Sequence, residues 1–356
     1  MTTETIKSIF SEFDHKSNYV SHSELNSGHI NDTFFVKSDG NKNYILQRIN
    51  HDIFKDVPGL VNNKVLTSNH IVSKYPTLSK EELSKKVLCF VKTKDTGFYY
   101  LNKDGNFWNV MIFIDDSITH EIVVDKEIAY EGGKLLGEFL NHTSDFDSSQ
   151  LIDVIPNFHN MSFRYKQYAS SIQSALKSRL KNAAKYIKVV TDLKDEMHIL
   201  QELKEAGKIP VRVTHNDTKI SNSLFDKDNK GICMIDTDTV MPGIIHYDFG
   251  DAIRTICNTA AEDEKDLSKV EFNLEYYQAY EKGFLEKTKD SLSPISLKHL
   301  PLAAKTMIFI MGLRFLTDYL NNDIYYKTNY SEHNLDRTKN QFKLIESFSK
   351  KKIKNV

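Results

Sequence analysis

The chain has almost no net charge and few cysteines. Its 47 lysine and arginine residues nearly balance its 48 aspartate and glutamate residues, so no overall field attracts nucleic acid or an anionic membrane surface. We therefore expect neither as a partner. The three cysteines, Cys89, Cys233 and Cys257, form no C-x-x-C pair and lie among apolar neighbours, which is typical of buried free thiols in a reducing cytoplasm.

The sequence also lacks internal repeats and long hydrophobic runs. Residues 1–13 are polar, with no apolar stretch before a small-residue cleavage site, so we expect no signal peptide and a cytoplasmic location. The most apolar segment, 302–316, contains Lys305 and Arg314 and is shorter than a bilayer-spanning helix. With 356 residues, of which 40% are hydrophobic, the chain is long enough for two lobes with a substantial core.

Two different periodicities divide the chain near residue 115. The N-terminal part alternates turns with short β-like runs at 19–20, 33–37, 44–49, 87–91, 98–101 and 109–114, as expected of antiparallel hairpins, and one helix is predicted at 58–74. The C-terminal part has helical spacing at 162–187, 192–206, 262–288 and 296–320. We predict an α+β, bilobal fold, with a nucleotide-binding lobe at 1–115 and a mainly helical catalytic lobe at 116–356.

One segment of the C-terminal part indicates the chemistry. Asp217 is followed after four residues by Asn222, which is the D-x-x-x-x-N spacing of a kinase catalytic loop. The apolar runs 223–225 and 232–235 flank a polar stretch that ends in glycine, and they predict a hairpin. Because a hairpin returns the chain to its starting point, Asp236 is expected to lie near Asn222.

Two oxygen ligands at one place suit a hard cation such as Mg²⁺ that bridges phosphate oxygens. Asn222 and Asp236 are therefore the predicted metal ligands. Asp217 is predicted to orient an acceptor hydroxyl and to take its proton as catalytic base. Lys219 is predicted to neutralise charge on the transferred phosphoryl group, with a solvated loop lysine as the alternative. Each residue alone has an ordinary explanation as a turn residue, but their joint spacing favours phosphoryl transfer.

Three motifs in this part of the chain carry a family resemblance. H-N-D-T-K-x-x-N at 215–222, I-D-x-D-T-V-M-P-G at 235–243 and Y-D-F-G-D-A-I-R at 247–254 resemble the signature of the aminoglycoside phosphotransferase and choline kinase superfamily. Segments 27–34, 44–50, 155–160 and 312–320 are similar to the N-acetylhexosamine 1-kinase group. The resemblance implies a protein-kinase-like fold. It also implies transfer of the γ-phosphoryl group of ATP, with Mg²⁺, to the anomeric hydroxyl of N-acetylglucosamine or N-acetylgalactosamine.

The nucleotide is expected to contact the N-terminal lobe through a phosphate-covering turn, one strand and the crossing between the lobes. The residues concerned are Gly28, His29, Asn31, Thr33, Gln47, Arg48, Phe113 and Ile114. A plain hairpin turn and a plain strand end are the structural alternatives for the first and the last of these features.

The ordinary nucleotide lysine of protein kinases is missing from the strand at 44–49. Gln47 stands at its place and Arg48 follows. Since side chains alternate along a strand, only one of the two can face the nucleotide. Arg48 is the preferred candidate, because a neutral amide leaves phosphate charge uncompensated. The helix at 58–74 also lacks an evident glutamate partner.

The remaining predicted site residues bind the acceptor or support the loop. The predicted acceptor contacts are Asp217, Asp238, Arg314, Tyr325 and His159. For Asp238 the alternative is support of the metal, for Arg314 an ion pair with Asp318 one helical turn on, and for His159 a place in the core. The residues predicted to give structural support are Asp248, Asp251 and Arg254.

Two explanations compete for the support residues. A helix is predicted from 251 to 260, and a carboxylate near its N-terminus is favourable as a cap. The resemblance implies instead that Asp248 braces the catalytic loop through hydrogen bonds and that Arg254 pairs within the same network.

Two other functions stay open at this point. The same chemistry applies to a choline-like amino alcohol, an aminoglycoside or another sugar, and the missing lysine also fits a nucleotide-binding regulatory protein without turnover. The preferred epimer and the nucleotide base stay open as well, and so does the oligomeric state, between a monomer and a weak dimer.

Overall fold

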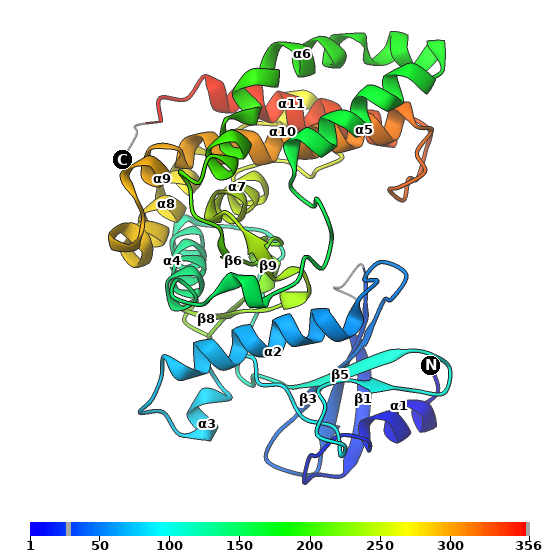
Figure 1. Ribbon diagram of the computed structural model, residues 1–356, viewed down its shortest axis with the longest axis vertical. Helices are drawn as coiled ribbons and strands as arrows, with labels where there is room; N and C mark the ends of the chain where they lie inside the picture. Colours follow the sequence, from blue (N-terminus) through cyan, green and yellow to red (C-terminus); the bar gives the residue numbers. More distant parts are fainter. Residues whose placement is uncertain (26–29, 354–356) are drawn as a thin grey trace.

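The computed structural model describes residues 1–25 and 30–353. Its N-terminal part contains a five-stranded antiparallel sheet in the order β1-β2-β3-β5-β4 (Figure 1). The strands are β1 (Tyr19–Leu25), β2 (Asp32–Ser38), β3 (Tyr44–Ile49), β4 (Tyr100–Leu101) and β5 (Phe107–Ile112). The run predicted as a strand at 87–91 forms only an isolated bridge, between Phe90 and Met111. Gly28 and His29 lie outside the described residues, so their nucleotide contacts stay predictions.

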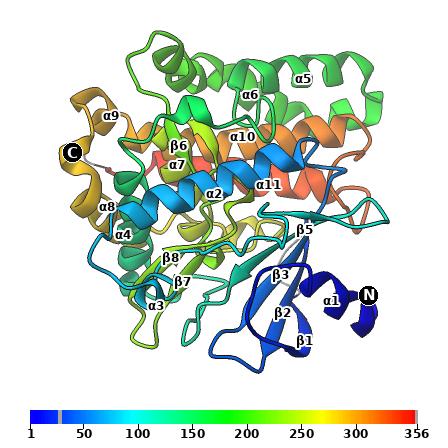
Figure 2. The same cartoon turned by 60° about the horizontal axis from the view of Figure 1, so that its bottom comes forward.

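The two faces of this sheet are covered by different helices. Side chains alternate along a strand, so that Leu46 and Trp108 face one side, where they pack in a cluster with α1 (Thr3–Phe10). Ile49 faces the other side and packs against α2 (Val57–Ser73). The helix predicted at 58–74 is therefore present, and it covers the face of the sheet that turns toward the rest of the chain (Figure 2).

The C-terminal part is mainly helical, and its helices differ in extent from those predicted. The helices are α4 (Lys126–His142), α5 (Met161–Ser174), α6 (Lys177–Glu205), α7 (Ile245–Ile256), α8 (Leu274–Thr288), α9 (Pro294–Lys298), α10 (Leu300–Leu320) and α11 (His333–Ser349). The break predicted near 188–191 lies instead at Ala175 and Leu176, which are extended. Val190 is buried in the core, and this packing outweighs the weak helix preference of its β-branched neighbours.

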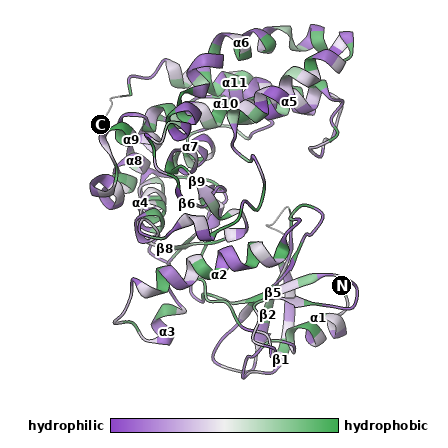
Figure 3. Cartoon of the chain, in the orientation of Figure 1, coloured by the Kyte–Doolittle hydropathy of each residue, from purple (hydrophilic) through white to green (hydrophobic). Residues whose placement is uncertain are grey.

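Helix α10 runs through the core of the C-terminal part. It is longer than the apolar segment suggested, and its 21 residues are long and apolar enough to cross a membrane by length and composition. However, 72% of its apolar window is buried inside the protein, where it packs against α5, α6, α7 and α11. Helix α6 lies on the outside and shows green and purple stretches in alternation (Figure 3), as expected of a helix buried on one side.

Helix α2 lies between the sheet and the helical part in both views (Figures 1 and 2). It contacts α4 and the short helix η3 (Thr237–Thr239) directly after Asp236. A hairpin of β7 (Ser223–Phe225) and β8 (Gly231–Met234) follows the catalytic loop. The predicted α+β, protein-kinase-like fold is thus confirmed.

Two glycines allow α4 and α8 to pack with their backbones in contact. A Cβ atom placed on Gly133 would lie 2.1 Å from the carbonyl oxygen of Tyr280, and one on Gly283 would lie 2.0 Å from that of Tyr130. Both distances are far inside van der Waals contact. Any larger residue at either position therefore has to push the helices apart.

We expect Gly133→Ala to lower the free energy of unfolding by about 2 kcal/mol, because the added methyl group meets backbone that cannot rotate away. Urea denaturation followed by circular dichroism measures this change. Gln278→Ala, at an exposed position of α8, is the control and should change stability by less than about 0.5 kcal/mol. Equal stability of the two variants would contradict the close approach of α4 and α8.

Candidate active site

A buried carboxylate holds the backbone of the catalytic loop in place. Asp248 is fully buried in the first turn of α7 and accepts hydrogen bonds from the backbone N–H groups of His215 and Asn216, each at 2.7 Å. Burial raises the pKa of Asp248 to about 7, against the lowering effect of these two bonds. The helix begins at Ile245 rather than at Asp251, so Asp248 and Asp251 lie within it and the capping prediction is wrong.

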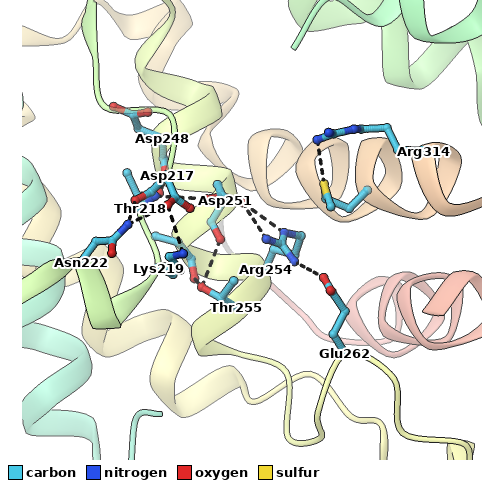
Figure 4. A network of polar contacts seen from close by, with 12 residues as sticks. Asp217, Thr218, Lys219, Asn222, Asp248, Asp251, Arg254, Thr255, Glu262 and Arg314 are labelled. Carbon is cyan, nitrogen blue, oxygen red and sulfur yellow. Dashed lines mark hydrogen bonds and ion pairs between the residues drawn. The ribbon is translucent and has the colours of Figure 1, made fainter. Parts of the chain in front are cut away.

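Asp251 and Arg254 form a second layer beneath the loop (Figure 4). Asp251 accepts a hydrogen bond from the backbone N–H of Thr218 at 3.1 Å and receives the Nε and Nη2 groups of Arg254 at 3.1 and 3.0 Å. Arg254 also pairs with Glu262 at 2.8 Å. Burial is the largest single influence and would raise the pKa of Asp251, but the charge and hydrogen bonds of Arg254, the charge of His159 and the hydrogen bond from Thr218 together lower that pKa. The loop backbone is therefore held by two carboxylates of one helix.

The side chain of Asp217 projects from this loop with one oxygen engaged. Asn222 donates its amide N–H to the Oδ2 atom of Asp217 at 2.8 Å and to its backbone carbonyl at 2.9 Å. The ammonium of Lys219 lies 3.1 Å from the same Oδ2 atom. The Asp217 side chain is 33% exposed, so its Oδ1 atom remains accessible. A carboxylate held in this way can receive a proton from a hydroxyl that approaches from the cleft.

The hairpin returns Asp236 to the catalytic loop. Ile235 donates its backbone N–H to the carbonyl of Asn222 at 2.8 Å, and Asp236 has a left-handed backbone with φ 57°. Its side chain is exposed, yet the charges of Asp238, Asp217, Lys219 and Lys64 act on it from nearby. Burial in these surroundings, together with the charges of Asp238 and Asp217, raises the pKa of Asp236 to about 7.

A cation would relieve this accumulation of negative charge. Asn222 uses its amide nitrogen for Asp217, which leaves its oxygen for a metal, and the hairpin brings Ile235, the neighbour of Asp236, back to Asn222. One amide oxygen and one carboxylate suit Mg²⁺, whose remaining ligands are normally phosphate oxygens and water. Within residues 1–25 and 30–353, no group of three or more His, Cys, Asp or Glu side chains is placed to hold a metal.

The preference for Arg48 over Gln47 is corrected by the structure. Arg48 pairs with Asp32 on the neighbouring strand, and its side chain is 38% exposed. Gln47 lies directly opposite Thr33 on β2, so both side chains share the face of the sheet that is covered by α2. The side chain of Gln47 is buried there. Side-chain alternation along β3 thus correctly predicted that Gln47 and Arg48 lie on opposite faces of the sheet. However, the face toward α2 carries the amide of Gln47 and not the guanidinium of Arg48.

A lysine that the sequence reasoning missed supplies the charge on this face. Lys64 of α2 is 2% exposed and donates to Gln47 at 3.0 Å and to Asp238, with which it forms a buried ion pair. The sequence carried a signal, since Lys64 stands at i+4 from Leu60 and i+3 from Val61, on the apolar stripe of the helix. A charged residue at such a position needs a partner.

Asp238 is a connector between the lobes. Besides Lys64 it accepts hydrogen bonds from Gln47, at 3.1 Å, and from Asn31. It is 3% exposed, and these bonds turn its carboxylate toward the N-terminal sheet. The predicted acceptor contact of Asp238 is therefore not the role that its surroundings fit. Asn31, predicted to contact the nucleotide, is occupied by Asp238 and by the backbone N–H of Asn50 at 2.8 Å.

The crossing between the lobes begins after β5. Phe113 donates its backbone N–H to the carbonyl of Asn43 at 2.9 Å, so this group is occupied by the sheet. Ile114 is buried and its carbonyl accepts from the Ser117 hydroxyl at 2.6 Å. The adenine contacts predicted at Phe113 and Ile114 therefore have to use backbone groups other than the N–H of Phe113 and the carbonyl of Ile114.

A cavity of about 490 Å³ lies between α5, α10 and the segment after α10, and its lining contains two of the five predicted acceptor residues. Arg314 and Tyr325 line it, and Tyr325 is 71% exposed. The alternative of an ion pair between Arg314 and Asp318 is wrong, because Asp318 accepts from the backbone N–H groups of Tyr325 and Tyr326 instead. His159 is buried, as its core alternative predicts, but neither ring nitrogen has a hydrogen-bonding partner in the described part of the chain.

The fold and the geometry of residues 215–236 define a kinase-like phosphotransferase. The chain belongs to the phosphotransferase enzyme family, whose model matches residues 94–290, over half of its length. It is a member of the class that the catalytic-loop motif indicated.

Solved structures of small-molecule kinases share the fold. A microcompartment-associated aminopropanol kinase is 14% identical, with a TM-score of 0.61 over 98% of this chain and 97% of that one. Choline kinase from Cryptosporidium parvum Iowa II is 14% identical, with a TM-score of 0.60 over 96% and 94%. A spectinomycin phosphotransferase in complex with ADP and spectinomycin is 12% identical, with a TM-score of 0.56 over 98% of each chain. At these identities the likeness establishes the fold.

We expect Lys64→Met to lower the free energy of unfolding by about 3–5 kcal/mol, since it leaves the buried carboxylate of Asp238 without its cation. The double variant Lys64→Met with Asp238→Asn should recover a large part of this loss. Denaturant titration of the wild type, both single variants and the double variant gives the coupling between the two residues.

The exposed pair of Lys74 and Asp145 is the control for this cycle. Lys74→Met should cost less than about 1 kcal/mol, because a solvated ion pair contributes little. If the Lys64 and Asp238 variants add without coupling, the buried pair does not exist in solution.

Proposed function

We propose that the protein transfers the γ-phosphoryl group of ATP to the anomeric hydroxyl of an N-acetylhexosamine. The observation that carries this proposal is the accessible carboxylate of Asp217, held by Asn222 and Lys219 beside Asp236. The anomeric oxygen forms the new bond to the γ-phosphorus, the bond to the oxygen of ADP breaks, and the hydroxyl proton passes to Asp217. Lys219 lies close enough to stabilise charge on the transferred group.

The N-terminal lobe, residues 1–115, is proposed to hold the nucleotide, and residues 116–356 to hold the acceptor and the catalytic groups. Bound Mg²⁺ would neutralise phosphate charge, with Asn222 and Asp236 as its protein ligands. Lys64 is the proposed substitute for the strand lysine, because it stands beside Gln47 at the interface of the lobes. The three free cysteines agree with a proposed place in a reducing compartment.

The charge around the acceptor cavity supports a sugar over an amine. Arg164 and Arg314 both line the cavity, and two guanidinium groups repel an ammonium group. A cationic acceptor such as choline, or a polyamine sugar, needs carboxylates and aromatic faces instead. Tyr325 and Arg314 provide an aromatic surface and several hydrogen-bond donors, which suit the hydroxyl and carbonyl oxygens of an N-acetylated sugar.

An ADP-release screen tests the proposal directly. The acceptors are N-acetylglucosamine, N-acetylgalactosamine, other free sugars, choline and aminoglycosides, and phosphorus NMR of the product identifies the ester. An anomeric phosphate with an N-acetylhexosamine is the expected result. Absence of that product with every N-acetylhexosamine refutes the acceptor, and ATP binding without ADP release for any acceptor supports the regulatory alternative.

We expect Asp217→Asn to reduce kcat by about 10²–10⁴-fold, because the amide cannot take the proton of the acceptor. The KM for ATP should change little, since Asp217 faces the acceptor side. Steady-state kinetics under saturating Mg²⁺ measure both constants. Asp228→Asn, in the exposed turn of the β7–β8 hairpin, is the matched control and should retain wild-type activity; an equally active Asp217→Asn variant removes the base from the mechanism.

A further inference from the structure

The cavity of about 490 Å³ is lined by two arginines, Arg164 and Arg314, that have no acidic partner among the described residues. It lies between α5 and α10 and is closed on one side by residues that follow α10. Arg164 projects from α5 and Arg314 from α10. In the part of the chain that the structure describes, neither forms an ion pair with a carboxylate, and their hydrogen bonds go to neutral groups.

Arg314 is held rigidly, with most of its donors unused. Its guanidinium lies over the rings of Phe158 and Tyr326, at 5.5 and 5.6 Å from their centroids. The Nη1 group is 3.4 Å from the sulfur of Met311, which is its hydrogen-bond partner among the described residues. Figure 4 shows the side chain extending from α10 on the side of the catalytic loop. Ring contacts of this kind fix the plane of a guanidinium without satisfying its five N–H donors.

Arg164 is bound only by neutral groups. Its Nε and Nη2 atoms donate to the carbonyl of Phe158 at 3.2 and 2.7 Å, and its Nη1 atom donates to Gln167 at 2.9 Å. Burial, together with the nearby charge of Arg314, lowers the pKa of Arg164 to about 10. Both arginines therefore stay charged at neutral pH and repel each other across Phe158.

The one acid of the cavity lining is occupied elsewhere. Asp318 accepts from the backbone N–H groups of Tyr325 and Tyr326 at 2.8 and 2.9 Å, and from the Asn334 amide at 2.9 Å. Its side chain is buried by these bonds. Arg164, Lys166 and Arg314 line the cavity against the single carboxylate of Asp318, so the lining has a net positive charge, which is a cost to the empty protein that an anion would remove.

His159 lies close enough to both arginines and to Asp251 for their charges to act on it. The ring is 8% exposed, and neither nitrogen has a hydrogen-bonding partner among residues 1–25 and 30–353. Burial lowers the pKa of His159 to about 3, and the charges of Asp251, Arg314 and Arg164 also act on it. A neutral imidazole with unused polar atoms thus stands between the arginines and the aspartate that holds the loop.

We propose that Arg314 and Arg164 bind an oxyanion carried by the acceptor itself, so that the preferred acceptor is an acidic sugar. The proposal rests on the proposed function, since it places the anomeric hydroxyl at Asp217 and the acidic substituent in the cavity. A carboxylate, a sulfate or a phosphate on a carbon away from the anomeric centre meets the same chemistry, because each pairs with a guanidinium through two oxygens.

Matched pairs of sugars test this proposal. N-acetylglucosamine is compared with its 6-sulfate, its 6-phosphate and its uronic acid, by ADP release and phosphorus NMR under identical conditions. We expect the acidic sugar to exceed its neutral parent in kcat/KM by at least tenfold. Arg314→Gln and Arg164→Gln should each lower kcat/KM for the acidic sugar on the order of 10- to 100-fold while changing that of the neutral parent little.

Two further variants separate binding from folding. Arg314→Lys keeps the charge without the planar fork and should recover part of the activity on the acidic sugar, whereas Lys188→Gln removes an exposed charge on α6 and should change nothing. Melting temperatures identify any variant that fails to fold. Free sulfate should inhibit competitively against the acidic sugar in the wild type and more weakly in Arg314→Gln.

The outcomes distinguish failure of the acidic acceptor from failure of the proposed function. Equal or better turnover of the neutral parent overturns the acidic acceptor and leaves sugar phosphorylation standing. Turnover of choline or an aminoglycoside alone overturns both. If acidic and neutral sugars bind equally well in calorimetry and neither is phosphorylated, the proposed function and the oxyanion site both fail.

Discussion

The backbone of the catalytic loop is held by one buried carboxylate, and the rest of the candidate site depends on it. Asp248 receives two N–H groups of the loop from the first turn of α7, where the helix dipole also favours a negative charge. Asn216 adopts a left-handed backbone with φ 64°, which asparagine tolerates better than most residues. The amide of Asn216 then bonds to Thr214 and Thr239, so the direction of Asp217 is set before any substrate binds.

A buried ion pair joins the two lobes, and it needs residues from both of them. Lys64 belongs to α2, Gln47 to β3, and Asp238 to the segment after the β7–β8 hairpin. In protein kinases a strand lysine meets a helix glutamate, whereas here the helix supplies the cation and the strand an amide. The buried ion pair with Asp238 therefore ties the position of α2 to the residues that follow Asp236.

The catalytic loop could be predicted because its residues are close together in the sequence. The rest of the site could not, because it depends on contacts between residues that are far apart in the sequence. Asp217, Asn222 and Asp236 lie within one loop and one hairpin, so their meeting follows from turn chemistry and strand pairing. Lys64 and Asp238 are far apart in sequence, and no local pattern announces their pairing. The same holds for Arg314. The residue at i+4, Asp318, was expected to form an ion pair with it, but Asp318 accepts hydrogen bonds from the backbone N–H groups of Tyr325 and Tyr326 instead.

Six residues separate Asp318 from Tyr325, whose backbone N–H group donates to the Asp318 carboxylate at 2.8 Å.

The separation of charge within the cleft determines how an acceptor can lie. Asp217 and Asp236 make the catalytic end negative until a cation and phosphates arrive, while Arg164 and Arg314 make the cavity end positive. His159, neutral and without hydrogen-bonding partners among the described residues, stands between the two ends. An acceptor with its reactive hydroxyl at one end and an acidic group at the other has one favourable orientation in this field. An uncharged sugar lacks an acidic group that would pair with the arginines, so the charge pattern supports the proposed acidic acceptor.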